Sequence, residues 1–191
     1  MRYLLFFKPY AVLSDFADPD GRPTLADYIL TPGVEPAGRL DADSEGLLFL
    51  TDDGRLAHAL TDPSFKLPKT YFVQVEPIPN ATALQKLRHG VSVKGKMTAP
   101  AEVELMPIPP ELPPRAVPVR DNPVVPTAWL KIVLREGKKR QIRHMTAAVG
   151  YPTLRIVRVA IGPLTLRGLA PGQWRELTPD ELAALRRMTR L

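Results

Sequence analysis

The chain has 191 residues, 45% of them hydrophobic, with 26 lysine and arginine residues against 20 aspartate and glutamate residues and a net charge of +6. This hydrophobic content is that of a globular protein and excludes a disordered chain. The absence of cysteine excludes disulfides and thiolate zinc sites. The apolar run at residues 3–7 is too short for a secretory signal or a membrane span. We therefore expect a soluble protein of the cytoplasm.

The charge is distributed unevenly along the chain. Residues 1–114 carry 11 basic and 15 acidic side chains, whereas residues 115–191 carry 15 basic and 5 acidic ones. Clustered lysine and arginine bind polyanions because they release the counterions condensed on phosphates. The second part of the chain therefore favours a nucleic-acid partner, and a merely solvated cationic surface is the alternative.

The apolar pattern and the capping residues predict nine elements. In chain order these are a strand at 3–7, a strand at 46–50, a short helix at 55–60, a strand at 70–75, a helix at 80–89, a strand at 128–134, a helix at 139–149, a strand at 154–161 and a helix at 179–188. Strands and helices are interspersed without regular alternation. This favours an α+β fold with a mixed, mostly antiparallel sheet.

A proline-rich segment interrupts this pattern. Eight of the twenty residues from 107 to 126 are proline, which fixes its own φ and lacks an amide donor. Neither a continuous helix nor a central strand can run through such a segment. We therefore expect a semi-rigid connection between two lobes, at about residues 1–106 and 127–191.

The glycine-bounded loop at residues 38–46 carries an arginine and three carboxylates directly before an apolar run. A loop that leads into a buried strand presents its side chains on a rigid support. It is therefore a candidate site for a reactive carboxylate, and an acidic surface turn is the alternative reading.

The same loop partly matches a calcium-binding loop. Positions 1, 3, 5 and 6 of such a loop would be filled by Asp41, Asp43, Glu45 and Gly46. Position 12, however, is Asp52 rather than a bidentate glutamate, and the prolines and glycines at 31–38 do not suit the preceding helix that a calcium site requires. These departures weigh against calcium.

Two further segments carry chemistry-bearing residues. Residues 135–144 hold a dense basic run, and on a helix that starts near Lys139 the pairs Lys139 with Arg143 and Arg140 with His144 would share faces. Lys69 and Tyr71 alternate onto one side of a predicted strand. The three histidines are scattered singly, and no phosphate-binding loop or serine nucleophile motif occurs.

Together these segments resemble the RsuA/RluE family of ribosomal RNA pseudouridine synthases. The matching motifs are GRLD at 38–41 with SEGLL at 44–48, KTY at 69–71, EGKKRQIR at 136–143, and the C-terminal signature at 150–158, 161–164 and 171–177. Few residues precede Lys8, where most of the family carries an RNA-binding S4-type domain. We therefore expect the RluE-type branch, which lacks that domain and acts on large-subunit (23S) ribosomal RNA. Phe7 replaces the usual asparagine, which leaves the role of that position open.

The resemblance implies the pseudouridine synthase fold, shared by the two lobes, and the isomerisation of a specific uridine. The bond from the sugar to N1 breaks, the uracil turns, and a bond to C5 forms. The reaction needs the uridine to be flipped out of its stack. The resemblance implies no metal and no other cofactor, and we expect the enzyme to act as a monomer.

The resemblance also implies residue roles. Asp41 would attack the sugar or remove a proton from it, Arg143 would pair with the Asp41 carboxylate and favour its charged form, and Tyr71 would stack on the uracil and take part in removing the C5 proton. Ile142 would pack against the base, and Arg39 would help to extrude the uridine or contact phosphate. The predicted substrate-binding residues are Arg39, Lys69, Ile142, Lys138, Lys139, Arg140, Arg155 and Arg158.

A non-catalytic RNA-binding factor of ribosome assembly is the alternative function. The presence of Asp41, Tyr71 and Arg143 favours an enzyme, because a protein without activity has no need to keep them. The target uridine, and whether the substrate is free RNA or an assembly intermediate, is not readable, because structured RNA is recognised largely by shape.

Overall fold

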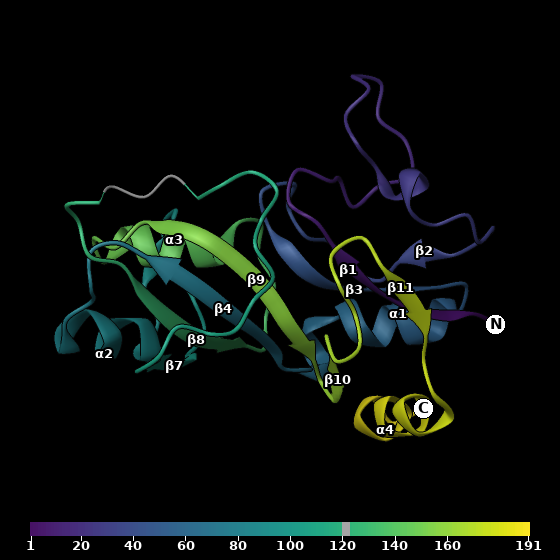
Figure 1. The fold of residues 1–191 in the computed structure, drawn as a ribbon. Helices are drawn as coiled ribbons and strands as arrows, with labels where there is room; N and C mark the ends of the chain where they lie inside the picture. Colours follow the sequence, from purple (N-terminus) through teal and green to yellow (C-terminus); the bar gives the residue numbers. More distant parts are fainter. Residues whose placement is uncertain (120–122) are drawn as a thin grey trace. The chain divides into compact units, whose positions relative to one another are not determined.

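The computed structural model describes residues 1–119 and 123–191, which form two compact units (Figure 1). Unit 1 comprises Met1–Leu67 and Arg158–Leu191, and unit 2 comprises Pro68–Val157. The strands of both units pair mostly antiparallel, which confirms the predicted α+β class. Within the described ranges, no helix is long and apolar enough to cross a membrane.

The division into units differs from the predicted lobes. The proline-rich segment 107–126 belongs to unit 2, and its described residues form neither helix nor strand. Residues 120–122 of this segment lie outside the described residues. The chain instead passes between the units after Leu67 and again inside β9 (Thr153–Ile161). A boundary inside a regular strand leaves no proline or glycine signal, which explains why the sequence does not reveal it.

Unit 1 is built around β1 (Tyr3–Lys8), which pairs antiparallel with β3 (Glu45–Thr51) on one side and with β11 (Trp174–Glu176) on the other. β3 lies next to β9, and two short strands complete the set: β2 (Glu35–Pro36) pairs with β3, and β10 (Leu164–Thr165) pairs with β9. The helices of this unit are α1 (Gly54–Thr61) and α4 (Pro179–Thr189), with single 3-10 turns at Leu25–Asp27 and Pro63–Phe65.

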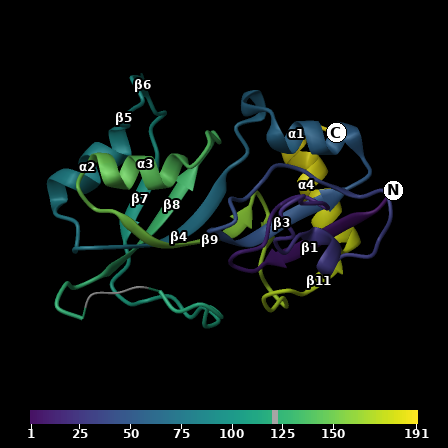
Figure 2. The same ribbon diagram turned by 90° about the horizontal axis from the view of Figure 1, so that it is seen from above.

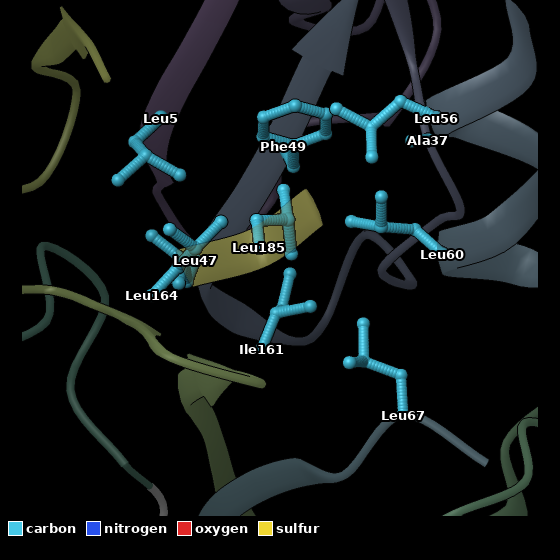
Figure 3. Close-up of a cluster of buried hydrophobic side chains, with 10 residues drawn as sticks. All are labelled: Leu5, Ala37, Leu47, Phe49, Leu56, Leu60, Leu67, Ile161, Leu164 and Leu185. Carbon is cyan, nitrogen blue, oxygen red and sulfur yellow. The ribbon is translucent and has the colours of Figure 1, made fainter. Parts of the chain in front are cut away.

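Every residue of β3 is buried because both faces of the strand are covered. Its side chains alternate between the two faces, so Leu47 and Phe49 join one apolar cluster while Leu48 and Leu50 join another. The first cluster also contains side chains of both helices, and Figure 3 shows its buried members: Leu5, Ala37, Leu47, Phe49, Leu56, Leu60, Leu67, Ile161, Leu164 and Leu185. The loop that precedes β3 is therefore attached to a fully packed strand.

Polar side chains define where the two helices of unit 1 begin. The carboxylate of Asp53 accepts hydrogen bonds from the amides of Arg55 and Leu56 at the start of α1. At the start of α4, Thr178 and Glu181 cap each other's backbone amides reciprocally. Helix termini leave backbone groups without intrahelical partners, and these side chains satisfy them.

In unit 2 the strand order is β9, β4 (Lys69–Val75), β8 (Ala128–Leu134) and β7 (Glu102–Leu105). The helices are α2 (Ala81–His89) and α3 (Gln141–Ala148), and a two-stranded hairpin is formed by β5 (Ser92–Val93) and β6 (Lys96–Met97). Figure 2 shows both helices and the hairpin on one side of these strands. Asn80 and Gly90 flank α2 as predicted.

Candidate active site

Asp41 lies in the loop between β2 and β3, with its backbone fixed on both sides. Before it, the buried Ser14 hydroxyl donates to the carbonyl of Leu40 at 2.8 Å and accepts from the Leu40 amide at 3.0 Å. After it, the amide of Ala11 donates to the carbonyl of Ala42 at 2.8 Å, and the amide of Ser44 closes a turn onto the carbonyl of Asp41 itself. Among the described residues, none donates a hydrogen bond to the Asp41 carboxylate. The loop therefore holds the backbone and leaves this carboxylate available.

The buried side chain of Lys8 forms hydrogen bonds with the backbone on both sides of this region. The side chain of Lys8, at the end of β1, is fully buried, and its ammonium donates to the carbonyls of Pro9 at 2.8 Å, Val12 at 2.6 Å and Ala42 at 3.5 Å. Burial lowers the pKa of Lys8 from 10.5 to about 7, although nearby carboxylates, including that of Asp41, act in the opposite direction. Lys8 thus connects the end of β1 to the loop of the candidate catalytic carboxylate, a role that no sequence pattern indicates.

The end of the loop is held against β9. Gly46 has φ of +111°, and a Cβ at this position would lie 2.2 Å from the carbonyl oxygen of Arg158. The Arg158 side chain is 3% exposed, and its Nε donates to the carbonyl of Leu47 at 2.8 Å. Only glycine fits such a close approach of two backbones with a positive φ.

These contacts exclude the calcium-loop interpretation of residues 41–52. Residues from Glu45 onward form β3, which pairs along its length with β1 instead of bending around an ion. Among the described residues, no group of three or more histidine, cysteine, aspartate or glutamate side chains could hold a metal ion.

Arg39 lies on the same loop and is largely exposed. It forms an ion pair with Asp15, and the two side chains are 67% and 40% exposed. An exposed pair of this kind contributes little to stability. The guanidinium group of Arg39 can therefore exchange Asp15 for a phosphate at small cost.

Unit 2 carries the other predicted catalytic residues. Tyr71 is a buried residue of β4, in register with Ile132 of β8, and Lys69 lies two residues earlier on the same strand. Ile142 is buried in the first turn of α3, and the next residue, Arg143, donates from Nη1 to the carbonyl of Thr153 at 3.3 Å. The predicted pairing of Arg143 with Asp41 stays a prediction.

The basic segment before α3 departs from its predicted geometry. The helix begins at Gln141, and Arg140 precedes it with φ of 54°, so Lys139 and Arg140 do not share helix faces with later residues. The Gln141 side chain explains the late start, because it accepts from the amide of Lys138 at 3.1 Å and donates to Glu136 at 2.6 Å. Residues 137–140 therefore form a loop with a fixed base, on which Lys138 and Lys139 are exposed.

Two predicted phosphate contacts are not supported. Arg155 and Arg158 are 7% and 3% exposed, and both guanidinium groups bind backbone carbonyls. Arg155 reaches the carbonyl of Pro113 at 2.8 Å and so anchors the proline-rich segment. Both residues lie on β9, and an isolated arginine in a strand pattern gives no sign of its burial.

Comparison with known proteins identifies the kind of enzyme to which these residues belong. The model of the family described as RNA pseudouridylate synthase matches residues 2–148. The chain belongs to the RNA pseudouridylate synthase family. The match contains the loop of Asp41, the strand of Tyr71 and the helix of Arg143, and it confirms the family predicted from the motifs.

Individual relatives agree with this family. The chain is 58% identical over 170 residues to ribosomal large subunit pseudouridine synthase E of Xanthomonas axonopodis pv. citri, covering 88% of this chain and 90% of the relative. It is 52% identical to the protein of the same name from Vibrio parahaemolyticus, covering 92% of this chain and 74% of the relative. A solved pseudouridylate synthase structure is 27% identical, with a TM-score of 0.78 over 96% of this chain and 73% of that one. This likeness confirms the predicted pseudouridine synthase fold.

Proposed function

We propose that this protein isomerises a specific uridine of large-subunit ribosomal RNA to pseudouridine. The observation that carries the proposal is the Asp41 loop, which matches the family motif and whose backbone is held by hydrogen bonds with the side chains of Ser14 and Lys8. The high identity to two enzymes named for the large subunit supports this choice of RNA. A rigid support for one available carboxylate suits a reaction in which that carboxylate attacks or deprotonates the sugar.

The chemistry balances without any added reactant. The bond between C1′ and N1 breaks, a bond between C1′ and C5 forms, the C5 proton leaves to water, and N1 regains a proton. Because the product is an isomer of the substrate, the reaction needs no oxidant or reductant. We propose that the enzyme acts as a monomer in the cytoplasm, where ribosomal RNA is found.

We assign the remaining roles as follows. Asp41 acts on the sugar, Arg143 stabilises its charged carboxylate, and Tyr71 stacks on the flipped uracil and participates in loss of the C5 proton. Lys69 and Ile142 help to hold the base. Contacts to the phosphates come from the exposed cations Arg39, Lys138 and Lys139 together with Arg140.

Release of tritium from RNA labelled at uridine C5 tests this function. Transcripts of large-subunit and small-subunit ribosomal RNA are incubated separately with the protein, and tritium in water is followed. We expect release from the large-subunit transcript only. Binding of that transcript without release would instead support the non-catalytic assembly factor, and release from the small-subunit transcript alone would contradict the assignment of the RNA.

A further inference from the structure

The β5–β6 hairpin of unit 2 carries two lysines that belong to none of the matched motifs. Its strands are joined by Lys94 and Gly95, which have φ of 51° and 75°. Two successive residues with positive φ form the tight turn that matches the natural twist of a hairpin. Lys94 and Lys96 are exposed at this turn, and Figure 2 shows the hairpin projecting beyond α2 and α3.

The base of the hairpin is rigid. Val91 and Thr98 are joined by two hydrogen bonds of 3.0 Å, one from the Val91 amide to the Thr98 hydroxyl and one from the Thr98 amide to the Val91 carbonyl. The preceding Gly90 lies so close to this pair that a Cβ would be 2.4 Å from the carbonyl oxygen of Thr98. The lysines at the tip are thus presented on a fixed support.

The hairpin is attached to the basic loop that precedes α3. The amide of Ala99 donates to the Glu136 carboxylate at 2.8 Å, and the ammonium of Lys138 donates to the carbonyl of Met97 at 3.4 Å. β5 also packs against α3. Four cations therefore belong to one continuous feature of unit 2, here named the hairpin surface: Lys94, Lys96, Lys138 and Lys139.

The hairpin surface has an excess of positive charge. Glu136 pairs with Lys138 at 3.3 Å, with the carboxylate turned toward the hairpin base by its bonds to Ala99 and Gln141. In the part of the chain that the structure describes, no carboxylate pairs with Lys94, Lys96 or Lys139. Exposed ammonium groups that pair with no carboxylate and stand on a well-held backbone suit contacts to backbone phosphates.

The composition of this surface indicates which form of RNA it fits. Proteins that bind single strands stack the bases on aromatic side chains. Residues 90–99 and 135–140 contain no aromatic residue. Paired RNA is instead recognised by its shape and backbone. We propose that the hairpin surface binds the backbone phosphates of a base-paired segment of the substrate RNA, an inference that rests on the proposed function.

The double variant Lys94→Gln/Lys96→Gln tests this inference. Its control, Lys66→Gln/Arg190→Gln, removes two exposed cations of unit 1, both of which have positive φ as Lys94 does. The dissociation constant for a large-subunit transcript is measured over a range of salt concentrations. We expect the hairpin variant to bind about tenfold more weakly at low salt and its salt slope to fall by about 1.5. The control keeps the wild-type slope.

Binding and turnover are measured on the same preparations, so that failure of the hairpin surface can be distinguished from failure of the proposed function. Loss of affinity with the same maximal rate of tritium release at saturating RNA supports the hairpin surface. A hairpin variant with the affinity and salt slope of the control overturns it, even when the wild type is active. A wild-type protein that binds RNA through the hairpin lysines but releases no tritium overturns only the proposed function. Equal loss of affinity for an unpaired oligonucleotide and for a paired stem would contradict the choice of paired RNA.

Discussion

The hydroxyl of Ser14 binds both backbone groups of Leu40, donating to its carbonyl at 2.8 Å and accepting from its amide at 3.0 Å. These two bonds join positions 26 residues apart and fix the chain directly before Asp41. Both groups are buried, so water cannot replace the hydroxyl without a rearrangement.

We expect Ser14→Ala to leave both Leu40 groups without this partner and to lower the free energy of unfolding by about 2 kcal/mol. The looser Asp41 loop should also reduce kcat more than it changes RNA affinity. Urea unfolding and tritium release check the two effects, with the exposed Ser92→Ala as the control. A Ser14→Ala protein with wild-type stability and kcat would show that this contact does not position the loop.

The close approach of Gly46 to Arg158 makes a second prediction. A Cβ at Gly46 would lie 2.2 Å from a backbone oxygen, and the residue has a positive φ. We expect Gly46→Ala to lower the free energy of unfolding by about 3 kcal/mol because both overpacking and backbone strain oppose it. Gly54→Ala is the matched control, since nothing lies within 4 Å of its Cβ position and it begins α1. Equal stability of the two variants would contradict this account.

The burial of Lys8 predicts a pH dependence of stability. Its pKa is about 7 in the folded protein against 10.5 for an unperturbed lysine. Between these values the unfolded state binds one more proton, so this group makes stability rise with pH by about 1.4 kcal/mol per unit. The stability difference between the wild type and Lys8→Met should therefore grow in favour of the wild type from pH 7 to pH 9. Urea unfolding of the two proteins at several pH values measures this difference, and a difference that stays constant from pH 7 to pH 9 would contradict the account.

The ion pair of Arg175 and Glu181 predicts a second rise of stability with pH, in the acid range. Hydrogen bonds from the Arg175 guanidinium, at 2.7 Å to each carboxylate oxygen, lower the pKa of Glu181 from 4.5 to about 2. Stabilisation by Glu181 is present above pH 4.5 and is lost as the pH falls toward 2. We expect Glu181→Gln to be less stable than the wild type by about 1 kcal/mol at pH 7 and equal to it near pH 2. Urea unfolding at several pH values checks this, and a difference that persists undiminished near pH 2 would contradict the account.

The sequence was sufficient to predict the longer helices and strands. All nine predicted helices and strands are present, because each has an apolar period or a cap that acts within its own residues. The missed strands, β2, β5, β6, β7, β10 and β11, have two to four residues. Such short strands are stabilised by partners distant in the chain, and no local period marks them.

Only those residues of the candidate site that lie in a family motif could be predicted from the sequence. Asp41 and Tyr71 lie in family motifs, whereas Ser14 and Lys8 support the loop through hydrogen bonds to Leu40 and Ala42, which are distant in the chain and leave no pattern in the sequence. The late start of α3 has a similar cause, since the side chain of Gln141 binds the loop before it. Burial of Arg155 and Arg158 likewise depends on the fold around β9 rather than on neighbouring residues.

The most direct test of the central claim compares Asp41→Asn with Asp43→Asn, a carboxylate of the same loop. Each protein is incubated with large-subunit ribosomal RNA labelled with tritium at uridine C5, and affinity for the same RNA is measured in parallel. We predict that Asp41→Asn releases no tritium while its affinity stays within a few fold of the wild type, and that Asp43→Asn keeps at least about a tenth of wild-type kcat. Release by Asp41→Asn at the wild-type rate would contradict the assignment of Asp41 as the catalytic carboxylate.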